Sequence, residues 1–185
     1  MPILTQLTAE QFLRFETRRG PVDMRQELVR GAIVEMTPPG ARHGAAQVGI
    51  GSLLQHAAEE AGTGRVFTET GFVLMRDPDT VRAPDVAFVR AARLLGGIPD
   101  GFVEGPPDLA VEIRSPSDGR RRVEDALADY RAAKTPVVWL VDPRARTLTV
   151  FTRGREPVVL GEGDEVSLVP LAPARRLRVA KLLGD

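Results

Sequence analysis

The sequence predicts an α/β fold in which a mixed β-sheet is flanked by helices. The expected order of elements is helix, strand pair, helix, hairpin, strand, helix, strand, strand. The run 108–142 has a strand–helix–strand pattern, which forms a right-handed crossover and places parallel strands in an otherwise antiparallel sheet. With 185 residues, 43% hydrophobic and 27% charged, the composition is that of a globular protein. We therefore expect a single domain over 1–185, with a core at about 8–151 and a C-terminal β extension at 152–185.

The first third of the chain predicts a helix, a strand pair and a second helix. Thr8 and Gln11 have the spacing of a capping box, which opens a short helix. Residues 26–36 are rich in apolar and β-branched side chains around Gly31, which predicts two strands with glycine at the bend. Apolar side chains recur at helical spacing over 43–61, so we expect a long helix there.

The rest of the chain predicts mainly strands. Residues 65–75 and 80–90 flank a turn-prone Asp-Pro-Asp segment, which predicts an antiparallel hairpin. The run 108–115 is apolar enough for a central strand, 120–133 has helical periodicity, and 136–143 predicts a second buried strand. Further short strands are expected at 146–151, 157–160 and 165–169.

Composition narrows the classes of function. The 25 basic and 25 acidic residues cancel, so overall charge indicates neither a nucleic acid nor a membrane partner. Without cysteine there is no disulfide, thiolate metal site or cysteine nucleophile, and two histidines are too few for a histidine-rich metal cluster. No stretch is long and apolar enough to cross a bilayer, and a signal peptide is not evident, so we expect a cytoplasmic protein. Of the basic residues, 23 are arginine and only Lys134 and Lys181 are lysine.

Two carboxylates lie where a strand disfavours them. Asp85 follows Pro84 in a predicted strand, and Glu112 interrupts an apolar one. A buried carboxylate is costly unless it is paired, hydrogen-bonded or bound to a metal. Arg114 projects to the same face as Glu112 in a regular strand. This pattern suits a divalent cation held by oxygen ligands, while ion pairs with Arg82 or Arg114 are the alternative interpretation.

Several segments together resemble the Uma2 family, also called DUF820, of restriction endonuclease-like proteins. In order, they are QELVRGAIVEMTPPGARHG, RVFTETGFVL, VRAPDVAFV, PDLAVEIRSPSD and DYRAAKTPVVWLVDPRARTLTVF. The resemblance extends from about Thr8 to about Phe151. It implies a restriction-endonuclease-like PD-(D/E)XK fold and a DNA endonuclease that depends on Mg²⁺ or Mn²⁺. It also implies assembly as a homodimer or higher homo-oligomer.

The resemblance assigns roles to four residues. Asp85 and Glu112 match the metal-binding carboxylates, and Glu27 matches an acidic residue that reaches the metal through water. Glu27 as an exposed strand-edge residue is the alternative. Arg114 occupies the position where the motif has lysine and would orient water or substrate, but a guanidinium stays protonated and cannot act as a general base. A structural pairing of Arg114 with Glu112 is equally compatible with the pattern.

This chain departs from the family pattern at the position where the family has a lysine. Its expected position, four residues before the tyrosine that matches Tyr130, is occupied by Ala126. Lys134 lies eight residues further along, roughly 12 Å on a helix, and is a poor substitute. A second hypothesis is therefore a catalytically weakened nuclease fold that binds nucleic acid or a protein partner. A structural oligomerisation module is the third.

Candidate contacts to nucleic acid lie at two predicted helix starts. His43 follows a Pro-Pro-Gly turn and could touch a phosphate, although a lone histidine more often caps or packs. Arg120, Arg121 and Arg122 form the densest basic run, close to where a nucleic-acid backbone would pass in this fold. A solvated helix face is the alternative for so short a run.

Overall fold

A computed structural model of the protein describes residues 6–19, 25–115 and 120–184. The helices are α1 (Ala9–Arg19), α2 (Ala41–Ala61), the 3-10 helix η1 (Ala91–Arg93), α3 (Arg120–Ala132) and α4 (Ala180–Leu183). The strands are β1 (Arg25–Val29), β2 (Ala32–Met36), β3 (Gly64–Thr68), β4 (Phe72–Met75), β5 (Thr80–Arg82), β6 (Val86–Arg90), β7 (Val103–Glu104), β8 (Leu109–Ile113), β9 (Val137–Asp142), β10 (Thr147–Thr152), β11 (Val158–Gly161), β12 (Glu165–Leu168) and β13 (Ala172–Arg178).

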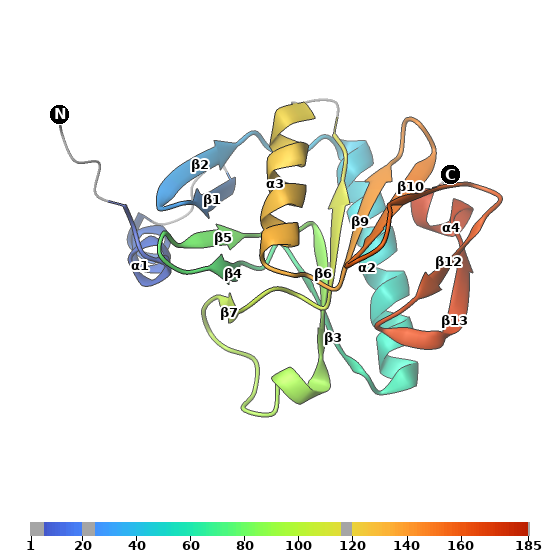
Figure 1. The fold of residues 1–185 in the computed structure, drawn as a ribbon, viewed down its shortest axis with the longest axis horizontal. Coiled ribbons are helices and arrows are strands. Elements are labelled where there is room, and N and C mark those ends of the chain that lie inside the picture. The colour runs from blue at the N-terminus through green and yellow to red at the C-terminus, as the bar shows by residue number, and fades with distance from the viewer. Residues whose placement is uncertain (1–5, 20–24, 116–119, 185) are drawn as a thin grey trace.

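The strands form three sheets. A six-stranded sheet has the order β11-β10-β9-β8-β6-β3, a five-stranded sheet has the order β2-β1-β5-β4-β7, and β12 pairs with β13. The predicted crossover is confirmed, because β8 and β9 run parallel on either side of α3 while β6 and β8 are antiparallel. The larger sheet is therefore mixed, and Figure 1 shows α3 on one side of it and α2 on the other.

The local predictions at the N-terminal end are confirmed. The Thr8 amide donates to Gln11 Oε1 at 2.8 Å and the Gln11 amide donates to Thr8 Oγ1 at 3.2 Å, which is a capping box at the start of α1. β1 and β2 form an antiparallel pair joined at Gly31, whose φ of 78° is a left-handed conformation that glycine adopts without strain. The long helix α2 ends at Gly62, also left-handed.

The predicted hairpin is real, but its two long strands are not continuous. Residues 65–75 divide into β3 and β4, and residues 80–90 divide into β5 and β6. The inner strands β4 and β5 pair in the smaller sheet, whereas β3 and β6 pair in the larger one. The chain thus changes sheets on each arm, and Pro84 lies in the second change, where an amide hydrogen for a strand ladder is missing. Asp85 follows it at the junction of the sheets.

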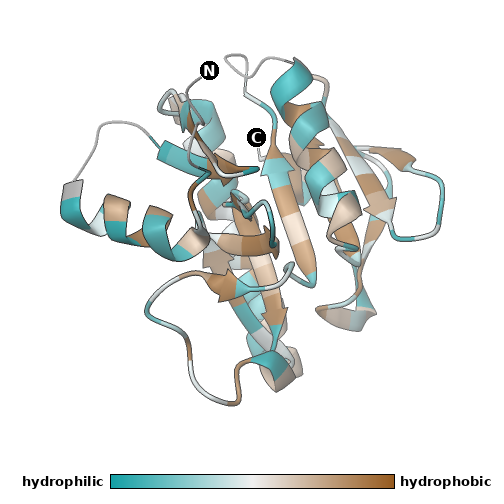
Figure 2. Cartoon of the chain, turned by 60° about the vertical axis from the view of Figure 1, so that its left-hand side comes forward, coloured by the Kyte–Doolittle hydropathy of each residue, from teal (hydrophilic) through white to brown (hydrophobic). Residues whose placement is uncertain are grey.

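Alternate residues of the six-stranded sheet supply two cores. On β8, Val111 packs in the cluster that contains α2, and Ala110 packs in the cluster that contains Tyr130 of α3, as the period of two in a strand requires. Figure 2 shows the apolar strands enclosed by helices with hydrophilic outer faces. Side chains on the α3 side of β8 and β6 therefore face Tyr130. In the described part of the chain, no helix is long and apolar enough to span a membrane.

The C-terminal segment contributes to the core on the α2 side. Val166, Leu171 and Leu182 are at most 4% exposed and belong to the same cluster as Trp139. The segment after β10 is thus held to the larger sheet by buried apolar side chains.

Leu171→Ala tests this packing. We expect the free energy of unfolding to fall by about 2–5 kcal/mol, because Leu171 is fully buried and alanine leaves a cavity. The matched control is Val159→Ala on β11, which is 65% exposed and should change stability by less than about 0.5 kcal/mol. Urea unfolding measures both, and equal effects would show that the segment does not pack as described.

Candidate metal centre

The predicted carboxylates Asp85 and Glu112 come together at the junction of the two sheets. In the antiparallel pair of β6 and β8, Val86 lies opposite Val111, so the next residues outward, Asp85 and Glu112, also face each other. Both border a cavity of about 20 Å³, room for one water-sized group. The other lining residues are Arg25, Met36, Thr37, Pro39, His43, Ser115 and Arg122.

Asp85 is held by three groups. Its Oδ2 accepts the Ile113 amide at 2.6 Å, and its Oδ1 accepts Arg25 Nη1 at 2.9 Å. His43 Nε2 lies 3.2 Å from the same Oδ1. Burial raises the pKa of Asp85, but hydrogen bonding from His43 and the charge of Arg25 outweigh it and lower the pKa below its usual value. Asp85 is therefore ionised, with one oxygen oriented by the backbone.

Glu112 has the opposite electrostatic environment. Burial, followed by the negative charges of Asp85 and Glu27, raises its pKa to about 8. Tyr130 donates its hydroxyl to Glu112 Oε1 at 2.7 Å, which fixes the carboxyl group from α3. Without a cation in the cavity, Glu112 therefore keeps its proton at neutral pH.

Glu27 is not among the residues that line the cavity and belongs to a buried ion cluster. Its Oε1 accepts the Ala83 amide at 2.9 Å, and its Oε2 accepts Arg82 Nη1 at 2.8 Å. Arg82 also donates from Nε to Asp129 Oδ2 at 2.9 Å. The three charged side chains are each about 3% exposed. Glu27 therefore anchors the backbone two residues before Asp85, and its predicted contact with a metal through water stays a prediction.

Arg114 is not among the residues that line the carboxylate cavity. It follows the last residue of β8, is 45% exposed at its side chain and pairs with Asp142 at 3.2 Å. Instead it borders a neighbouring cavity together with Arg144 and Arg146. The alternative interpretation, in which Asp85 and Glu112 form ion pairs with Arg82 or Arg114, does not describe the observed contacts. Asp85 pairs with Arg25, and Glu112 accepts a hydrogen bond from Tyr130.

The predicted nucleic-acid contacts divide between the cavity and the surface. His43 and Arg122 both line the carboxylate cavity. Arg121 is 94% exposed at its side chain and lies 4.0 Å from Asp125. Arg120 begins α3, and its side chain lies outside the described part of the structure.

Sequence reasoning missed Arg25 and Asp129, and it named Arg82 only as a possible partner of Asp85 or Glu112 rather than of Glu27 and Asp129. Arg25 stands two residues before Glu27 on β1, so the period of two in a strand could have placed it on the same face. Arg82 and Asp129 meet across 47 residues, and no local pattern indicates that contact.

Ala126 occupies a buried position on the side of α3 that packs against the larger sheet. It is 8% exposed and packs in the same cluster as Tyr130, one helical turn away. Besides His43, the basic groups that line the cavity are Arg25 and Arg122. Both are arginines, so the cavity has positive charge beside its carboxylates but no lysine among its lining residues.

The donor set fits a hard divalent cation. Mg²⁺ is usually held by one or two carboxylates and keeps several waters, and Asp85 and Glu112 face each other across a small polar space. Among residues 6–19, 25–115 and 120–184, no group of three or more histidine, aspartate or glutamate side chains has the arrangement of metal ligands. Two protein carboxylates with water completing the shell is thus the arrangement these residues can offer.

Comparison with known proteins decides the family. The Uma2 family, described as "Putative restriction endonuclease", matches residues 9–180. The chain belongs to the Uma2 family. No curated protein matches it significantly.

A solved structure agrees with the family fold. The crystal structure of "a putative nuclease belonging to DUF820" from Anabaena variabilis has a TM-score of 0.82 at 22% identity, covering 96% of this chain and 97% of that one. This Uma2 protein therefore has the restriction-endonuclease-like fold that its sequence predicts. A DrdV–DNA complex also matches, with a TM-score of 0.41 and 16% identity over 78% of this chain and 12% of that one.

The Glu112→Gln substitution tests the electrostatics of the centre. The pKa of Glu112 is about 8 in the folded protein against an ordinary 4.5, so the native state binds a proton that the unfolded chain releases. This stabilisation is complete below about pH 4.5 and is lost as pH rises through about 8. We expect the wild type to lose stability over this range relative to Glu112→Gln, which keeps an acceptor for Tyr130.

Urea unfolding in EDTA across this pH range measures the difference. His56→Gln, on an exposed part of α2, serves as a control that should follow the wild type. Parallel stability curves for Glu112→Gln and the wild type would contradict the raised pKa.

Proposed function

We propose that this Uma2 protein is a metal-dependent DNA endonuclease that hydrolyses phosphodiester bonds with Mg²⁺ or Mn²⁺ held by Asp85 and Glu112. The observation that carries the proposal is the facing pair of carboxylates around a water-sized cavity. Their strongly different proton affinities mark a site that lacks one positive charge. Membership of a family described as putative restriction endonucleases supports the same chemistry.

In this proposal, the groups around Asp85 and Glu112 would hold the two carboxylates in a fixed orientation and help to balance the charge of the site. The Ile113 amide fixes Asp85, and the Tyr130 hydroxyl fixes Glu112, so the two carboxylates keep their relative geometry. A bound Mg²⁺ or Mn²⁺ would polarise a phosphoryl oxygen and lower the pKa of an attacking water. Glu112 would give up its proton on binding the cation, because the added positive charge reverses the effect of Asp85.

Arg25 and His43 have a second task in this proposal. Both contact Asp85 Oδ1, one of the two oxygens of a proposed ligand. A phosphate oxygen that reaches this water-sized cavity would offer them a new acceptor, and arginine binds phosphate in a planar, two-point geometry. These side chains would therefore exchange a carboxylate for the substrate phosphate when the site fills.

The decisive experiment compares the wild type with Asp85→Ala and Glu112→Ala on plasmid and linear DNA. We expect each substitution to lower the rate of Mg²⁺- or Mn²⁺-dependent cleavage by about 100-fold or more, because one of two ligands is lost. Calorimetric titration with Mn²⁺ alone should show weaker binding in both variants.

His56→Gln is the control for purification and handling and should cleave like the wild type. Circular dichroism verifies that all variants are folded. Equal cleavage by the wild type and both folded cavity variants would overturn the proposal.

A second candidate is a nuclease fold that has lost most of its catalytic power and binds nucleic acid or a protein partner. The observation that favours it is Ala126, where the family pattern has lysine. This candidate predicts little cleavage by the wild type even at saturating metal.

Ala126→Lys separates the two candidates. A lysine one turn before Tyr130 would reach the cavity, and we expect cleavage to rise by about 10-fold or more. Ala128→Lys is the matched control, since Ala128 lies on the exposed face of the same helix. Strong turnover by pure wild type eliminates the weakened fold. A folded Ala126→Lys variant that cleaves no better than Ala128→Lys would show that a lysine here contributes nothing.

A further inference from the structure

The carboxylate cavity opens beside a second, larger cavity of about 500 Å³. The two share His43 and Ser115 in their walls. The larger one is bordered by four arginines, which come from separate parts of the chain: Arg42, Arg114, Arg144 and Arg146. We call this space the arginine cavity.

Positive charge in the arginine cavity exceeds the negative charge that faces it. Arg114 pairs with Asp142, and Arg146 pairs with Glu162. Arg42 and Arg144 have no carboxylate within ion-pair distance among residues 6–19, 25–115 and 120–184. Both are exposed side chains, so their charge is available to a ligand that enters from solvent.

The start of α2 adds to this field. α2 has 21 residues, its N-cap Gly40 has no side-chain cap, and its first turn carries no acidic residue. Gly40, Ala41 and Arg42 all border the arginine cavity. The partial positive charge of a helix N-terminus therefore acts in the same direction as the guanidinium groups.

The chemistry of the lining indicates which part of a nucleic acid would bind. Besides the arginines, the described lining consists of glycine, alanine, proline, serine and histidine. It offers no phenylalanine, tyrosine or tryptophan on which a base would stack. Guanidinium groups match phosphate oxygens in a two-point geometry, so the walls suit a phosphodiester backbone rather than a base.

We propose that the arginine cavity binds backbone phosphates of DNA next to the cleaved bond, with Arg42 and Arg144 as the principal contacts. The inference rests on the proposed nuclease function, since His43 and Ser115 link this cavity to the carboxylates. The strand would then pass from the β9–β10 turn along the start of α2 into the metal centre. Arg114 acts here as part of the binding surface, beside its ion pair with Asp142.

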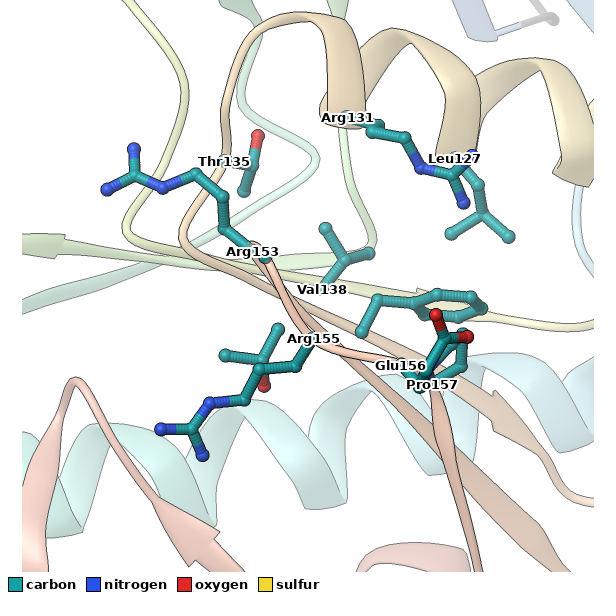
Figure 3. A pocket seen from close by; sticks show the side chains of 11 residues that line it. Leu127, Arg131, Thr135, Val138, Arg153, Arg155, Glu156 and Pro157 are labelled. Carbon is teal, nitrogen blue, oxygen red and sulfur yellow. The ribbon is translucent and has the colours of Figure 1, made fainter.

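The chain offers a matched control in a cavity of about 570 Å³ at the other end of α3. Figure 3 shows Arg131, Arg153 and Arg155 around it, with Leu127 and Val138 in its wall. Among the described residues, it shares no lining residue with the carboxylate cavity. Arg131 and Arg155 are exposed like Arg42 and Arg144, so the same change of charge can be made far from the centre.

The test compares Arg42→Gln/Arg144→Gln with Arg131→Gln/Arg155→Gln. Binding of a short fluorescein-labelled DNA duplex is measured by fluorescence anisotropy in EDTA, which prevents cleavage, between about 50 and 200 mM salt. Each phosphate contact contributes about 0.9 to the slope of log K against log salt, so the first variant should lose about 1.8 units of slope. The control variant should keep the slope of the wild type.

Three further measurements make the result decisive. Arg42→Lys/Arg144→Lys keeps the charge and should recover most of the slope, and thermal unfolding verifies that every variant is folded. Equal weakening by both glutamine variants, or an unchanged slope in the first, would overturn the inference. Cleavage by the wild type but not by Asp85→Ala would leave the nuclease proposal standing in that case, so the two failures are distinguishable.

Discussion

The buried guanidinium of Arg82 is the interaction on which the centre depends. It lies between Glu27 of β1 and Asp129 of α3, and all three side chains are about 3% exposed. Glu27 in turn accepts the Ala83 amide, so the cluster fixes the point where the chain leaves one sheet for the other. Removing one partner of such a buried group leaves an uncompensated charge at a cost of about 3–5 kcal/mol. The position of Asp85 is therefore secured by charges that do not line the cavity.

The same buried ion cluster leaves the cavity short of positive charge. One guanidinium serves both Glu27 and Asp129, and the remaining charge of Glu27 helps to raise the pKa of Glu112 to about 8. Asp85 adds to this effect from the facing strand position. The protein compensates with a proton on Glu112 and with Arg25 and His43 on Asp85. In the proposed metal site, a divalent cation would take the place of the proton on Glu112 and add positive charge beside Asp85.

The sequence predicted the parts of the structure that depend on local pattern. The capping box at Thr8, the strand pair around Gly31 and the parallel crossover around α3 all follow from spacing and periodicity. The position of Arg114 did not, because the rule of alternation applies only within a strand and β8 ends one residue earlier. Arg82 and Asp129 were also out of reach, since their contact is made by the packing of α3 on β5.

The scarcity of lysine now has a structural meaning. With Ala126 at the family position, the basic groups that line the carboxylate cavity besides His43 are arginines, and a guanidinium does not release its proton under any physiological condition. Arg25 and Arg122 can neutralise charge and orient a phosphate, but they cannot take a proton from water. In the proposed nuclease, these arginines would therefore support binding and charge stabilisation, and proton transfer would depend on the carboxylates, His43 or solvent. A lysine can both stabilise charge and transfer a proton, whereas in this cavity the two tasks would fall to different groups.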